Sequence, residues 1–196
     1  MSIKLFLQML ANFFRSTSKK NEPKELPPSN TSVSIESSVK MNKRPVSTVE
    51  EAIARYGTIN NNKWKDEYKW MVLFQTPDWF VANVKGMDGN PCKRIYMNKD
   101  MVKPFEDALK NISDRKLEDE LKTFDGCFNI RMIRGTTDKP STHTYGVGID
   151  LNAGENPLGH QGLFTEELGK CFEDAGFTWG RRWKRQDSMH FEFSWG

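Results

Sequence analysis

Cysteine is scarce in this sequence of 196 residues, and the positions of the few that occur exclude two common uses of it. Cys92, Cys127 and Cys171 are odd in number and lie far apart, so they form neither a disulfide framework nor the paired-cysteine pattern of a structural zinc site. We therefore expect three reduced and buried thiols.

Large apolar residues are also few: hydrophobic residues make up 37% of the chain and the mean hydropathy is -0.69. The shortage is greatest over residues 15–46, where Ser, Lys, Asn and Pro dominate. Such a segment cannot bury enough surface to offset its ordering entropy. We predict an N-terminal amphipathic segment and a disordered, flexible linker over residues 1–46, followed by one domain over residues 47–196.

The first 14 residues contain five apolar side chains on one helical face: Ile3, Phe6, Leu7, Leu10 and Phe14. A helix here would allow a weak contact with a membrane surface or with a partner. A frayed terminus and an unusual secretion signal are the alternatives. The segment is too short to span a bilayer.

Positive and negative charges nearly balance over the whole chain, and the small positive excess lies in its N-terminal tail. Residues 1–62 contain nine Lys/Arg and five Asp/Glu, which leaves twenty against twenty-one for the rest. The tail does not interleave basic with aromatic residues, so we expect no nucleic-acid partner.

Helical and strand patterns alternate along the domain without regular β-α-β spacing. Helices are predicted over 47–57, from Lys103 to Ile112, around Leu117 to Leu121, and from Phe164 to Ala175; strands are predicted over 71–74, 93–98 and 127–133. Pro104 is placed in the first turn of its helix, and Thr165 caps the last one. The pattern predicts an α+β fold with a small antiparallel sheet flanked by helices.

Two further segments alternate like strands and place polar residues opposite the core. In VGIDLN (147–152) and DSMHFEFSW (187–195), Asp150 and His190 point away from the apolar face. His143 lies in the turn before the first strand. Each of these residues alone would most simply be structural, but two imidazoles and a carboxylate form the ligand set of catalytic zinc, whereas all-oxygen ligands would favour Ca or Mg.

A hydrolytic site also needs a base and a group that stabilises negative charge. Asp187 lies three residues before His190, close enough in sequence to reach the same metal. Arg131, at the end of the predicted strand 127–133, is a candidate to stabilise an oxyanion, and Arg134 is the alternative.

Two motifs in this order resemble a known family. The segments SxHxYGxxxD (141–150) and DxxHFEF (187–193) are similar to the paired motifs of the zinc D-Ala-D-Ala carboxypeptidases and L-alanyl-D-glutamate endopeptidases. This is the VanY-like group, peptidase family M15, which includes many bacteriophage endolysins. The stretches 126–135 and 176–193 also resemble that group, so the likeness covers roughly residues 47–196.

The resemblance implies a role for each matching residue. His143, Asp150 and His190 would bind zinc, and Asp187 would be the general base that carries a proton from water to the leaving amine. Arg131 would stabilise the carbonyl oxygen. The remaining candidates, which would orient the metal loop or contact the substrate, are Ser141, Tyr145, and either Trp183 or Trp179.

This sequence departs from the family pattern at two positions. Gly148 stands where alanine is common, which we expect only to relax packing. Asp187 stands where many relatives have Glu, so the shorter side chain must come closer to the water.

The resemblance implies a peptidase that hydrolyses stem peptides of bacterial peptidoglycan, as phage endolysins do. Such a protein would be made in the cytoplasm and act as a monomer at the cell wall, on the periplasmic or extracellular face. Which bond it cuts, L-Ala-D-Glu or D-Ala-D-Ala, is open. The alternative is a non-catalytic wall-binding or virion module that retains the fold, but the complete ligand set together with Asp187 favours an enzyme.

Three nearby features have two interpretations each. His160 is expected to be a loop residue, with lining of the cleft as the alternative. Glu192 either supports His190 or is solvated. The basic residues 181, 182, 184 and 185 either form a solvated surface or attract the carboxylates of the substrate.

Overall fold

The computed structural model of the chain describes residues 49–61 and 63–193. The amphipathic segment and linker predicted over residues 1–46 lie outside these ranges. Among the described residues, no helix has the length and apolar character needed to cross a membrane.

The strands form three antiparallel sheets, which confirms the predicted α+β class. Two are pairs of strands, β1 (Ile59–Asn60) with β2 (Lys63–Trp64) and β3 (Met71–Gln75) with β4 (Arg94–Asn98). The third has the order β5-β6-β8-β7 and is made of β5 (Phe124–Gly126), β6 (Gly148–Leu151), β7 (Phe177–Trp179) and β8 (His190–Phe193). The strands predicted at 71–74, 93–98, 147–152 and 187–195 are thus present, although shorter or shifted at their ends.

The helices predicted over 47–57 and 164–175 are present with similar ends, and two further short helices were not predicted. The helices are α2 (Val49–Tyr56), α3 (Glu67–Trp70), α4 (Asp78–Asn83), α5 (Lys99–Asp114) and α6 (Glu166–Glu173), with single 3₁₀ turns η1 (Glu118–Glu120), η2 (Thr142–Tyr145) and η3 (Gly180–Arg182). Thr165 caps α6 as predicted, because its hydroxyl accepts a hydrogen bond from the Leu168 N–H at 3.1 Å. The short helix predicted around Leu117 is the 3₁₀ turn η1.

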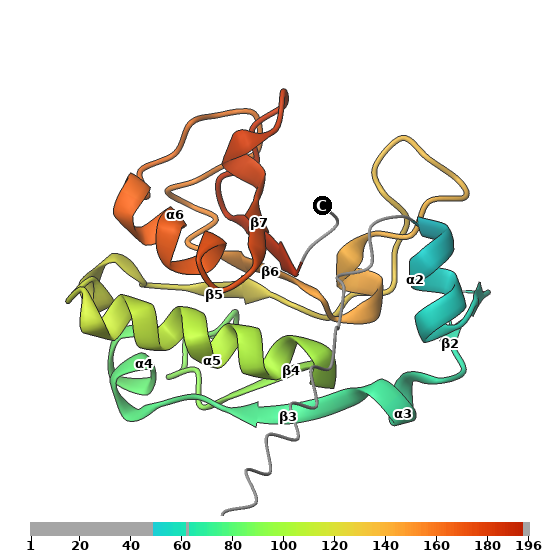
Figure 1. Cartoon of the computed structure of the whole chain (residues 1–196), viewed down its shortest axis with the longest axis horizontal. Coiled ribbons are helices and arrows are strands. Elements are labelled where there is room, and N and C mark those ends of the chain that lie inside the picture. Colours follow the sequence, from blue (N-terminus) through green and yellow to red (C-terminus); the bar gives the residue numbers. More distant parts are fainter. Residues whose placement is uncertain (1–48, 62, 194–196) are drawn as a thin grey trace, which may run out of the picture. The chain divides into compact units, whose positions relative to one another are not determined.

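Helix α5 lies between the β3–β4 strand pair and the four-stranded sheet (Figure 1). Its buried stripe is Met101, Phe105, Ala108, Leu109 and Ile112, as the sequence predicted. This stripe belongs to one core with β3, β4, β6, β8 and α6. The core therefore supports β6 and β8 from one face and leaves their other face for polar side chains.

The start of α5 differs from the prediction. The helix begins at Lys99 rather than near Lys103, because the Asn98 side chain caps it by accepting a hydrogen bond from the Asp100 N–H at 2.9 Å. Pro104 consequently lies inside the helix. Its cost there is about 3 kcal/mol, which the burial of the apolar stripe offsets.

The strand predicted over 127–133 is wrong. This segment pairs with residues 139–143 through only a few backbone bonds, including Ser141 N–H to Arg131 O and Asn129 N–H to His143 O, both 3.0 Å, and one bridge between Met132 and Pro140. A regular ladder does not form because Pro140 has no N–H to donate and the partner segment coils into η2 immediately afterwards.

A second, smaller core cluster joins helix α2 to the loop that contains η2. It contains Ala52, Tyr56, Trp64, Met71, Tyr145 and Val147. Tyr145 has no exposed surface, and its hydroxyl donates a hydrogen bond to Gly57 O at 3.2 Å. This cluster fixes the loop that carries His143 to the rest of the domain.

A substitution of Phe191 tests whether one face of β8 packs in the core while the other carries the polar residues. Its ring stacks on Phe172 at 4.0 Å and on Trp179 at 5.7 Å between centroids, and it is fully buried. We predict that Phe191→Ala lowers the free energy of unfolding by about 3–5 kcal/mol, measured by denaturant titration. Leu163→Ala, at a side chain 74% exposed, should change it by less than about 0.5 kcal/mol. Equal effects of the two substitutions would contradict this packing.

Candidate metal centre

Asp150 and His190 are direct partners across two neighbouring strands. Strand β6 pairs with β8 in the register Gly148 to Glu192, Ile149 to Phe191 and Asp150 to His190. Because alternate residues share a face, the ring of His190 meets the carboxylate of Asp150, and His190 Nδ1 lies 2.8 Å from Asp150 Oδ1.

His143 reaches the same point from the 3₁₀ turn η2. Ser141 begins this turn, and its hydroxyl oxygen accepts a hydrogen bond from the His143 N–H at 3.4 Å. Gly146 ends it with a φ of 64°, and a Cβ there would lie 2.7 Å from the Met71 side chain. The chain therefore turns sharply between His143 and the start of β6.

The three predicted ligands converge. His143 Nε2 lies 3.1 Å from His190 Nδ1 and 3.3 Å from Asp150 Oδ2. Among the described residues this is the one group of three or more His, Cys, Asp or Glu side chains found close enough to hold a metal ion. Both histidines are buried and Asp150 is partly exposed.

The far nitrogen of each imidazole has its own acceptor, which fixes the ring. His143 Nδ1 lies 2.9 Å from Cys127 O, and a carbonyl can only accept, so Nδ1 carries the hydrogen and Nε2 presents a lone pair to the site. His190 Nε2 lies 3.1 Å from Glu192 Oε2, which in the same way directs Nδ1 inward. Both rings are thus oriented for metal binding.

Carboxylates dominate the electrostatics around His190. Burial by itself lowers the pKa of His190, but the hydrogen bonds and charges of Asp150 and Glu192 outweigh it and raise the pKa to about 10. For Asp150, burial favours a higher pKa, yet hydrogen bonds with His143 and His190 hold the pKa well below its usual range. In the absence of a metal, His190 therefore carries a proton between two carboxylates.

Asp187 lies beside this cluster with an unsatisfied oxygen. Its Oδ1 is buried and has no hydrogen-bond partner among the described residues. Burial raises the pKa of Asp187, while the charges of His190, His143 and Arg131 act in the opposite direction. A carboxylate with a raised pKa and a free lone pair is suited to accept a proton.

Arg131 is anchored at its backbone and exposed at its side chain. Thr144 Oγ1 accepts a hydrogen bond from the Arg131 N–H at 2.9 Å and donates one to Arg131 O at 2.6 Å. The guanidinium is near enough for its charge to act on Asp187. Arg134 lies further along, in the exposed turn that follows.

The remaining residues that the sequence suggested for the site differ in how deeply they are buried. Ser141 and Tyr145 are buried, which favours orientation of the metal loop over contact with a substrate. Trp183 is 37% exposed and its ring centroid lies 5.4 Å from that of His190. Trp179 is fully buried against Phe191, so of the two tryptophans only Trp183 is placed to contact a substrate.

We expected that glycine in place of alanine at position 148 would only relax the packing, and this expectation is wrong. A Cβ at this position would lie 2.6 Å from Thr142 Oγ1 and 2.9 Å from His190 Cε1. The space that an alanine would need is filled by Thr142, whose hydroxyl lies 3.4 Å from His190 Nε2. The sequence offered no signal for this close approach.

The other polar residues near the site separate into structural and exposed groups. Arg182 forms ion pairs with Glu166 and Glu173, and Arg181 donates to Phe164 O at 2.7 Å. These two arginines therefore hold η3 against α6, whereas Lys184 and Arg185 are exposed. His160 is exposed in a loop, as expected.

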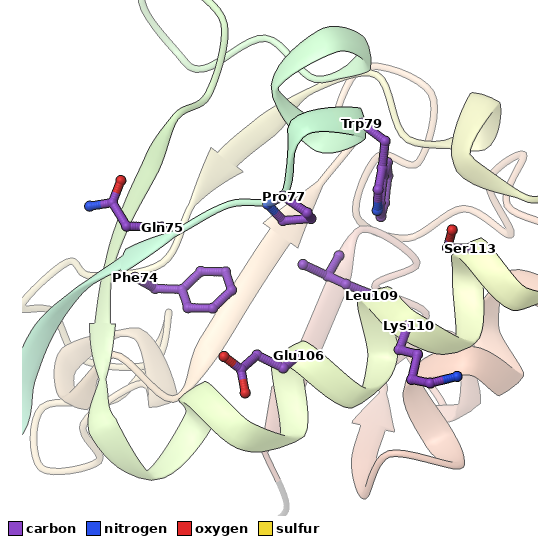
Figure 2. Close-up of a pocket in the computed structure, with 8 residues that line it drawn as sticks. All are labelled: Phe74, Gln75, Pro77, Trp79, Glu106, Leu109, Lys110 and Ser113. Atoms are coloured by element: carbon purple, nitrogen blue, oxygen red, sulfur yellow. The ribbon is translucent and has the colours of Figure 1, made fainter. Parts of the chain in front are cut away.

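A pocket of about 290 Å³ lies elsewhere, between the end of β3, the start of α4 and one side of α5. Figure 2 shows that apolar Phe74, Pro77, Trp79 and Leu109 line it together with polar Gln75, Glu106, Lys110 and Ser113. None of the candidate site residues lines it, so we do not associate it with the metal centre.

The comparisons with known proteins agree with this site. A family model described as D-alanyl-D-alanine carboxypeptidase matches residues 134–193. The matched segment carries all three candidate ligands and Asp187, so the match supports the resemblance to the M15 peptidases that the motifs indicated. No curated protein and no solved structure matches the chain.

The contact between Glu192 and His190 predicts a role in metal affinity. We expect Glu192→Ala to weaken Zn²⁺ binding by about 10- to 100-fold, because His190 loses the acceptor that fixes its ring. Glu192→Gln, which keeps an acceptor oxygen, should lose less. Competition with a chromogenic chelator measures both, with Glu167→Ala, at an exposed position of α6, as the control. Unchanged affinity in Glu192→Ala would contradict the role.

The raised pKa of His190 predicts proton release on metal binding. Since this pKa is about 10 without metal, a cation at Nδ1 must displace about one proton per chain at pH 7. Titration calorimetry in buffers of different ionisation enthalpy measures it. The raised pKa of His190 also makes the stability of the metal-free chain depend on pH. Protonated His190 contributes its full stabilisation below about pH 6.5, and this contribution is lost as the pH rises towards 10. A buffer-independent binding enthalpy would contradict this account.

Proposed function

We propose that this protein is a zinc-dependent peptidase that hydrolyses stem peptides of bacterial peptidoglycan. The observation that carries the proposal is the convergence of His143 Nε2, His190 Nδ1 and the Asp150 carboxylate beside Asp187, whose buried Oδ1 has no hydrogen-bond partner among the described residues. The family match over the same segment supports a peptidase.

The donor set is the reason for proposing zinc. Two imidazole nitrogens and one carboxylate, with a further position for water, are the ligands of catalytic zinc, whereas calcium and magnesium prefer oxygen ligands alone. Four ligands at tetrahedral angles about zinc lie about 3.3–3.4 Å apart. The three separations here are 2.8, 3.1 and 3.3 Å, so a small expansion would accommodate the ion.

Each residue near the metal would have a separate role in the hydrolysis. Zinc, when bound, would make water more acidic and polarise the peptide carbonyl. Asp187 would take one proton from the attacking water as the oxygen–carbon bond forms, and would pass that proton to the leaving amine as the carbon–nitrogen bond breaks. Arg131 would offer its guanidinium to the negative charge on the former carbonyl oxygen. Trp183 would form a wall for the substrate.

Peptidoglycan is proposed as the substrate on the strength of the family description and the motifs. The protein would act as a monomer at the bacterial cell wall, as phage endolysins do. A weak membrane-surface contact through residues 1–14 would be one way to reach it. The bond cut is either L-Ala-D-Glu or D-Ala-D-Ala.

Digestion of purified peptidoglycan tests the proposal and names the bond. Mass spectrometry of the soluble peptides should show cleavage at one of the two bonds, and chelation followed by zinc addition should abolish and restore it. Asp187→Asn keeps the size of the side chain but removes its basicity, so we expect a loss of about 10²- to 10⁴-fold in kcat with zinc still bound. Wild-type rates in Asp187→Asn would show that the base is misassigned, and no cleavage by the zinc-loaded parent would refute the function.

A further inference from the structure

We infer that Gly180 is a positioning residue for Asp187, and that the absence of its side chain lets this carboxylate stand beside the metal ligands. The inference rests on the proposed function, because it assigns Asp187 the role of base. Gly180 begins the 3₁₀ turn η3, directly after β7, and is buried.

The space that a side chain would need at Gly180 is filled by Asp187. A Cβ built on Gly180 would lie 2.4 Å from Asp187 O, 3.1 Å from its Cβ and 3.3 Å from its carbonyl carbon. Two of these atoms are backbone, which cannot rotate away as a long side chain can. Any L side chain at position 180 therefore requires the backbones of residues 180 and 187 to move apart.

Hydrogen bonds close the loop from 180 to 187 at the same glycine. The Asp187 N–H donates to Gly180 O at 3.0 Å, and the Trp183 N–H donates to the same oxygen at 3.1 Å. On the other side, Asp187 O accepts from the His190 N–H at 3.0 Å. Asp187 is therefore connected at once to Gly180 and to the start of β8.

This arrangement separates two properties of the site. His143, Asp150 and His190 take their positions from η2 and from the β6–β8 pairing, in which Gly180 has no part. Among the described residues, the one hydrogen bond that links Asp187 to a metal ligand runs from the His190 N–H to Asp187 O, and β8 keeps its pairing with β6 without it. The position of the Asp187 carboxylate depends on how closely its backbone approaches Gly180. A displacement at Gly180 should therefore reduce turnover while it leaves metal binding intact.

The experiment compares Gly180→Ala with Gly154→Ala in the full chain. Gly154 is exposed and a Cβ there would meet nothing within 4 Å, so this variant controls for the loss of a glycine. We expect Gly180→Ala to lower kcat by about a hundredfold, with the zinc affinity and KM close to those of the parent. In the Asp187→Ala background, Gly180→Ala should add little, because the group that it displaces is already gone.

Each outcome bears on a distinct claim. Parent-like kcat in Gly180→Ala, or a fall in kcat that is equally large in the Asp187→Ala background, would overturn the inference while the proposed function stands. Loss of zinc binding or of cooperative unfolding in Gly180→Ala would also overturn it, since the glycine would then serve the fold as a whole. A zinc-loaded parent that cleaves no wall peptide would refute the proposed function itself.

Discussion

The antiparallel pairing of β6 with β8 is the constraint on which the rest of the site depends. Its register sets Asp150 opposite His190 and Ile149 opposite Phe191, so one register places two candidate metal ligands together on one face and two core side chains together on the other. A shift by one residue would exchange these faces. The core formed with α5 and α6 therefore stabilises the ligand geometry as well as the fold.

Burying this much charge needs compensation, and the surrounding contacts provide it. Asp150 and Glu192 both face His190, and the carbonyl of Cys127 faces His143, so the outer nitrogen of each imidazole has an acceptor and a protonated His190 lies between two carboxylates. A proton on His190 satisfies the two carboxylates when no metal is present. A divalent cation would satisfy the inward-facing atoms better, because it interacts with all three at once.

The sequence was most informative where a local pattern coincides with tertiary structure. Alternation identified the two faces of β6 and β8, and a hydroxyl cap identified the start of α6. The predictions failed at two places. No strand ladder forms over 127–133, because Pro140 and the turn η2 in the partner segment prevent it. Helix α5 starts earlier than predicted, because the Asn98 cap outweighs the signal from Pro104. The close approaches at Gly148 and Gly180 depend on contacts across strands and turns, which no spacing in the sequence encodes. The contact of Glu192 with His190 was one of the two interpretations that their spacing on one strand face allowed.

The central claim is that three side chains, brought together by one strand pair and one 3₁₀ turn, hold a single metal ion through defined atoms. The most direct test is an anomalous difference map, recorded at the zinc absorption edge from crystals grown with zinc. The account predicts one strong peak per chain about 2.0–2.2 Å from His143 Nε2, His190 Nδ1 and an Asp150 carboxylate oxygen. A peak at His190 Nε2, or at another site with none here, would contradict it.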